Sequence, residues 1–106
     1  MTLAADLDSL YDLLKDHRTT SALARRVDGS SCPVHSPEAV SFCLLGACFK
    51  IGGDDEQRVE RIQTVLRAAL AKNNHSRWRF VLGFFNDTST LEEVLDVVAT
   101  AKSQVQ

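Results

Sequence analysis

A chain of 106 residues that is 44% hydrophobic can bury a modest core, so we expect a single domain over residues 1–106. Its formal net charge of −2 creates no general attraction to nucleic acid or to anionic lipid, so we expect no nucleic-acid partner. No apolar run approaches the roughly 20 residues of a membrane-spanning helix, so we expect no membrane partner either.

The first predicted element is an amphipathic helix over residues 2–15, which Thr2 can cap. Leucines recur along one face of this helix, at Leu3, Leu7, Leu10 and Leu14. Acidic residues, among them Asp6, fall on the opposite face, where we expect solvent. The pattern therefore predicts a helix that packs on the core through its leucines.

Residues 22–35 form the least regular part of the sequence, and we predict a small irregular or β-hairpin insert there. Asp28 and Gly29 are typical of a turn, with short stretches on either side that could pair. Because a two-stranded ribbon is only marginally stable alone, the insert should lie on the helices. Its two arginines, Arg25 and Arg26, are interpreted first as surface charge.

The central predicted element is a buried helix over residues 37–51, around which the other helices should pack. Ser36 suits the N-cap, Pro37 suits the first helical position, and Gly52 suits the end of the helix. The segment is apolar on all sides, which is typical of a helix enclosed by protein. Gly46 in its middle indicates close approach of another backbone. A buried strand is the alternative interpretation, since a short apolar run fits both.

Two further amphipathic helices are predicted over residues 54–72 and 90–105. Asp54 can cap the first of them, and its apolar residues recur at helical spacing. Thr90 and Glu93 have the spacing of a capping box, in which each side chain bonds the backbone amide of the other residue.

Between these two helices, residues 77–85 are short and aromatic, and their spacing fits a helix or a strand, with a short helix favoured. The predicted fold class is therefore mainly α. We expect a compact bundle of four to five helices around the buried helix 37–51, with the small insert 22–35 on its surface.

Three groups of residues carry a resemblance to a known family: segments 24–29, 39–47 and 85–95. They resemble a family of small uncharacterised proteins from bacteria and their phages. Its pattern contains an Ala-Arg-Asp turn, an aromatic-Cys-x-x-Gly-Ala helix and a Trp-Asn-Asp motif before the last helix. This sequence differs from the pattern by Phe85 in place of tryptophan and Arg26 in place of aspartate. The resemblance implies the layout and no known activity.

Cysteine chemistry has one candidate arrangement, in which Cys43 is the nucleophile, His35 or His75 the base and Asp87 the orienting group. We expect Cys43 to lie mid-helix among apolar residues, where a thiol is usually inert, so no catalytic residue is predicted. The odd number of cysteines argues against a disulfide framework and predicts a cytoplasmic protein.

Metal and nucleotide binding have weaker signals. Cys32 and His35 have the spacing of half a zinc site, but a second half is missing, so we predict no metal and no cofactor. Arg77-Trp78-Arg79 could stack a base or bind a phosphate. The simpler interpretation places Trp78 in the core with the arginines beside it in solvent.

The sequence is most consistent with a non-enzymatic protein-binding or regulatory accessory module of bacterial or phage origin. The alternative is a small-ligand or metal-binding domain that uses the insert 25–35 and a loop at Asn86-Asp87. The candidate binding residues are Arg25, Asp28, Asn86 and Asp87. We further expect a half-buried ion pair between Arg25 and Asp87 that ties the insert to the last helix. Local capping by Asp87, without a distant partner, is the other interpretation.

Overall fold

The computed structural model describes residues 2–75 and 81–105. The elements within these ranges, in chain order, are α1 (Leu3–His17), β1 (Ala24–Arg25), β2 (Ser41–Phe42), α2 (Leu44–Gly52), α3 (Glu56–Lys72), α4 (Leu82–Thr88) and α5 (Leu91–Val105). The strands form one two-stranded antiparallel sheet. This architecture confirms the prediction of a mainly α bundle with a small β element.

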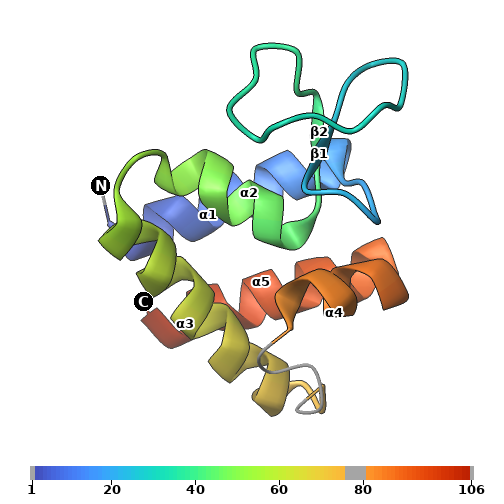
Figure 1. Ribbon diagram of the computed structural model, residues 1–106. Helices are drawn as coiled ribbons and strands as arrows, with labels where there is room; N and C mark the ends of the chain where they lie inside the picture. Colours follow the sequence, from blue (N-terminus) through green and yellow to red (C-terminus); the bar gives the residue numbers. More distant parts are fainter. Residues whose placement is uncertain (1, 76–80, 106) are drawn as a thin grey trace.

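Helix α2 contacts α1, α3 and α4, and α1 likewise contacts three helices, α2, α3 and α5. Helices α1 and α3 also contact α5, so that their apolar faces enclose a common core. Figure 1 shows the two strands and the loops beside them at one end of the molecule, at the top of the view, with the helices below them. None of the helices in the described ranges is long and apolar enough to cross a membrane.

Helix α1 begins as the sequence predicts, since the Thr2 hydroxyl accepts a hydrogen bond from the Ala5 amide at 3.1 Å. Its leucine face is buried. The prediction that Asp6 faces solvent is wrong, because Asp6 is only 2% exposed. Its two carboxylate oxygens accept hydrogen bonds from Nε and Nη2 of Arg58 on α3, at 3.0 and 2.6 Å. This pair joins two helices that are far apart in the sequence.

The central helix is shorter than predicted, because α2 starts at Leu44 and residues 37–43 are not helical. Ser36 caps only a local turn, in which its hydroxyl accepts from the Glu38 amide. The true N-cap is Cys43, whose thiol accepts from the Gly46 amide at 3.3 Å. The apolar run begins as strand β2 because β1 supplies hydrogen-bonding partners that are remote in sequence.

The predicted insert forms hairpin-like hydrogen bonds within residues 22–35, from the Arg26 amide to the Ser30 carbonyl at 2.8 Å and from the Cys32 amide to the Ala24 carbonyl at 3.1 Å, and it also pairs outside this range. Its main partner is β2, with Ala24 opposite Phe42 and Arg25 opposite Ser41. Inside the insert, one isolated bridge joins Arg25 to Ser31. The expected turn at Asp28-Gly29 is present, and Gly29 adopts a positive φ of 88° there.

The first turns of α3 and α5 test two further predictions. The cap of α3 is Asp55, which accepts from the Arg58 amide at 3.1 Å, and not the predicted Asp54. The capping box of α5 is confirmed: the Thr90 amide donates to Glu93 Oε1 at 2.9 Å, and the Glu93 amide donates to the Thr90 hydroxyl at 3.2 Å.

Helix α4 confirms the helical interpretation for the end of segment 77–85 and continues beyond it to Thr88. Asn86 and Asp87 therefore lie on a helix and not on a loop. Residues 76–80 are outside the described part of the chain, and with them the interpretation of Arg77-Trp78-Arg79.

Candidate functional site

The buried side chain of Asn86 joins three separate segments of the chain. Its Oδ1 accepts hydrogen bonds from Nε of Arg18 at 3.2 Å and from the Leu44 amide at 3.1 Å. Its Nδ2 donates to the Thr19 carbonyl at 3.0 Å and to Asp87 Oδ1 at 3.1 Å. A side-chain amide has two donors and one oxygen with two lone pairs, so all of its capacity is used. With Asn86 at 0% exposure, its role is to hold these segments together.

Arg18, which follows α1, is the second member of this network. Besides its bond to the Asn86 side chain, its Nη2 donates to the backbone carbonyls of Asn86 and Ser89 at the end of α4. A cation is favourable at a helix C-terminus, where the last carbonyls lack partners within the helix. The sequence does not single out Arg18, because no local pattern connects it to residues some 70 positions away.

Asp87 extends the network to the loop after α1. Its Oδ1 accepts from the Ser21 amide at 2.8 Å, and Ser21 has a positive φ of 63°, which is uncommon for a residue other than glycine. The exposed Asp87 thus holds an unusual backbone conformation in place.

Arg25 does not pair with Asp87, so the predicted ion pair is wrong. Its guanidinium donates to the carbonyls of Gly29 at 2.8 Å and Thr20 at 2.9 Å. The other interpretation, local capping by Asp87 without a distant partner, is wrong as well, because the amide that donates to its Oδ1 belongs to Ser21, 66 residues earlier in the chain. Arg25 instead joins the turn of its own insert to the loop that precedes the insert.

Asp28 also bonds locally. Its Oδ1 accepts from the Ser30 hydroxyl at 2.7 Å and from the Ser30 amide at 2.9 Å. These two hydrogen bonds lower the pKa of the Asp28 carboxyl, because they stabilise its charged form. Of the four candidate binding residues, the structure therefore brings together Asn86 and Asp87 on α4, while Arg25 and Asp28 bond within the insert.

The cysteines lie in apolar surroundings. Cys43 and Cys48 are buried, and burial raises the pKa of both thiols. The position of Cys43 at a helix N-terminus would by itself favour the thiolate, but desolvation outweighs it. Cys32 is partly exposed. Within the described ranges, no group of three or more His, Cys, Asp or Glu side chains could hold a metal ion.

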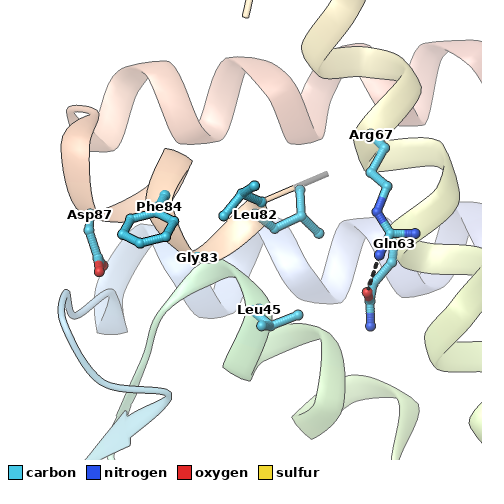
Figure 2. A pocket seen from close by; sticks show the side chains of 8 residues that line it. Leu45, Gln63, Arg67, Leu82, Gly83, Phe84 and Asp87 are labelled. Carbon is cyan, nitrogen blue, oxygen red and sulfur yellow. Dashed lines mark hydrogen bonds between the residues drawn. The ribbon is translucent and has the colours of Figure 1, made fainter. Parts of the chain in front are cut away.

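A hollow of about 370 Å³ lies between α3 and α4 (Figure 2). Eight residues line it: Leu45, Gln63, Arg67, Val81, Leu82, Gly83, Phe84 and Asp87. Its middle is apolar, and its charged groups stand at opposite ends in Figure 2, with Arg67 at one end and Asp87 at the other. A hollow of this size and composition is typical of a site for a small apolar group.

Arg67 and Gln63 form the polar end of this hollow from successive turns of α3. Arg67 Nη2 donates to Gln63 Oε1 at 2.8 Å, and Nη1 lies 3.6 Å from an exposed carboxylate oxygen of Glu60. Arg67 Nε is buried without a hydrogen-bond partner. Neither residue stands out as a site residue in the sequence. Their i, i+4 spacing predicts contact on one helix face, but it does not indicate a hollow formed with α4.

Comparison with known proteins places the chain in a family. A family model matches residues 1–104, and the chain belongs to this family, DUF6197, which is described as a family of unknown function. No curated protein and no solved structure matches the chain. Membership agrees with the predicted resemblance to an uncharacterised family, and it assigns no activity to the hollow or to the Asn86 network.

Proposed function

We propose that the chain is a non-enzymatic protein-binding module with a regulatory accessory role, and that its partner binds at the hollow between α3 and α4. The observation that carries this proposal is a group of exposed apolar side chains at the hollow. Val81 is 38% exposed and Phe84 is 62% exposed, next to Leu45 and Leu82 on its inner side. Apolar side chains that cluster at a surface depression are typical of interaction sites.

The state of the polar groups supports binding over catalysis. The Cys43 thiol is the N-cap of α2, and burial raises its pKa. The raised pKa disfavours a nucleophilic thiolate. Asn86 uses its full hydrogen-bonding capacity within the protein. For the same reason the alternative, a small-ligand or metal site at the insert and Asn86-Asp87, is not favoured. A cytoplasmic location and a bacterial or phage origin belong to this proposal as well.

The test compares two lysine substitutions at exposed apolar positions. Phe84→Lys places a charge at the hollow, whereas Val27→Lys is the matched control on the insert, where Val27 is 91% exposed. Each protein is immobilised and used to capture partners from a lysate of the organism that encodes it. We expect one partner to be retained by wild type and by Val27→Lys, and to be lost with Phe84→Lys.

The retained protein is then purified, and its Kd for each variant is measured by calorimetry. We expect Phe84→Lys to weaken binding by at least about tenfold, because a charge would have to be desolvated against apolar groups. Equal affinity of the partner for wild type and Phe84→Lys contradicts the proposal. Loss of capture with Val27→Lys but not with Phe84→Lys contradicts it as well. Unchanged melting temperatures for both variants establish that the effect is on binding.

A further inference from the structure

The polar end of the hollow has a donor that the protein leaves without an acceptor. Arg67 Nε is buried and makes no hydrogen bond. Buried donors of this kind are rare in native proteins, because they lose their bonds to water and gain none in exchange. The other two nitrogens of the guanidinium face Gln63 and Glu60. The unpaired nitrogen is thus an unusual feature beside an otherwise apolar surface.

Gln63 adds further donors at the same end. The residue is only 8% exposed, and its Oε1 is occupied by Arg67. Its Nε2 carries two N–H groups, and no other described residue accepts a hydrogen bond from them. This end of the hollow therefore presents N–H donors and a guanidinium whose ion-pair partner is the exposed Glu60 carboxylate, at 3.6 Å, while the Gln63 oxygen is already bonded. Such a set is complementary to a carboxylate, which has only acceptors.

The opposite end of the hollow has the opposite charge. Asp87 stands there on α4, exposed, with Oδ1 bonded to backbone and side-chain donors and a negative charge facing solvent. Figure 2 shows Leu82, Gly83, Phe84 and Leu45 between Asp87 and Arg67. A ligand with a carboxylate at the Arg67 end is favoured if its other end carries N–H groups or a cation, because a second anion would be repelled by Asp87.

We propose that the hollow binds the C-terminus of a partner protein whose last residue is apolar. The α-carboxylate binds Arg67 and Gln63, the last side chain contacts Leu45 and Leu82, and the preceding chain leaves toward Asp87. This inference rests on the proposed function and specifies its partner. In a terminal residue the carboxylate and the side chain branch from one Cα, which suits a hollow of about 370 Å³. An internal Asp or Glu would bring backbone on both sides.

Three synthetic peptides of similar length test the source of the carboxylate. The first is Lys-Ser-Gly-Ser-Leu with a free carboxyl group, and the second is the same peptide with a C-terminal amide. The third is Lys-Ser-Leu-Glu-Ser with a C-terminal amide, which offers only a side-chain carboxylate. Binding is followed by NMR through the methyl resonances of Leu45, Val81 and Leu82 and the Nε–H resonance of Arg67.

We expect the free-acid peptide to shift these resonances saturably. It should bind at least about tenfold more tightly than either amidated peptide, because only in the free acid are a carboxylate and an apolar side chain attached to the same Cα atom. Arg67→Gln should remove the difference between acid and amide. Arg61→Gln, an exposed arginine on the same helix with the same change in charge, should retain it. Arg67→Lys keeps the charge without the planar donors, and should lose most of the preference.

Equal binding of acid and amide overturns the inference, and so does an equal effect of Arg61→Gln and Arg67→Gln. Tighter binding of the third peptide assigns the site to a side-chain carboxylate and overturns it too. If the captured partner depends on Phe84 but the peptides show no carboxylate preference, the inference fails and the proposed function stands. If the peptides behave as expected but capture does not depend on Phe84, the proposed function fails instead.

Discussion

The backbone of Gly46 lies directly against the carbonyl group of Leu23, such that a Cβ atom on Gly46 would be 2.0 Å from the Leu23 oxygen. The glycine of α2 is therefore required by the approach of the chain that leads into β1. This contact confirms the expectation, from the sequence, that another backbone passes close to Gly46. At this contact the residue that precedes β1 packs against α2.

Replacing this glycine should destabilise the protein. Gly46→Ala is expected to lower the free energy of unfolding by about 1–3 kcal/mol, because the added methyl group forces two backbones apart. Gly83→Ala is the control, since a Cβ on Gly83 in α4 meets no atom within 4 Å. It should stabilise by up to about 1 kcal/mol, as alanine is the better helix former. Urea unfolding of both variants measures this, and an increase in stability for Gly46→Ala would contradict the contact.

The buried pair of Asp6 and Arg58 predicts a large effect of removing one charge. Asp6→Asn should cost about 2–4 kcal/mol, because it leaves the partly buried guanidinium without its partner. Asp8→Asn, which removes the exposed partner of Lys102, should cost no more than about 0.5–1 kcal/mol. In a thermodynamic cycle with Arg58→Met, the double variant should lose less than the sum of the single variants. Strict additivity would show that the two side chains act independently.

The Asn86 network predicts that this residue tolerates almost no substitution. Asn86→Ala should destabilise by at least about 3 kcal/mol, because the Leu44 amide and the Thr19 carbonyl lose their partner inside the protein. Hydrogen exchange at the Leu44 amide should become faster in the same variant. Normal stability with slow exchange at Leu44 would indicate that other groups satisfy that amide.

The cysteines should differ in their rate of labelling by a thiol reagent. We expect Cys32 to react first, since Cys43 and Cys48 are buried and burial raises the pKa of both thiols. Cys32→Ser should remove the fast phase under native conditions, and denaturation should expose the other two cysteines. Rapid labelling of Cys43 in the native protein would contradict this expectation and would indicate a reactive nucleophile.

The capping box of α5 predicts a dependence of stability on pH. The hydrogen bond from the Thr90 amide lowers the pKa of Glu93 below its usual value of 4.5. A lowered pKa in the folded state means that the stabilisation is complete above the unfolded pKa and is lost as the pH falls through the folded pKa. In Glu93→Gln, the loss of stability between pH about 7 and pH about 3 should be smaller than in wild type. An unchanged loss would exclude a contribution from this carboxylate.

The sequence predicts the long helices well, because α1, α3 and α5 each repeat apolar residues over several turns. It fails at residues 37–43, where a short apolar run fits a strand and a helix equally, and where only the remote partner β1 decides. The displaced start of α2 also misplaces Cys43, which is a cap and not a mid-helix residue. Local periodicity contains no information about such long-range pairing.

The candidate site shows the same limit. The four predicted binding residues have polar side chains, but most of their hydrogen-bonding groups are already bonded to other groups of the protein. Arg67 and Gln63 lie on a helix that is correctly predicted, yet their significance depends on α4 lying opposite to them. A pattern within one helix predicts which residues share a face. It cannot predict which other helix turns that face into a hollow.

The reach of the Asn86 amide also has a consequence for synthesis of the protein on the ribosome. Its partners Thr19 and Leu44 precede it by 67 and 42 residues, so both leave the ribosome well before α4 does. A nascent chain that holds α1, the strands and α2 has their direct contacts but lacks the buried amide that bonds to both Thr19 and Leu44. Long-range contacts form late, because the chain between them must first be closed. Completion of the native state thus waits for α4, and until then the incomplete chain is more open to proteases and chaperones than the finished protein.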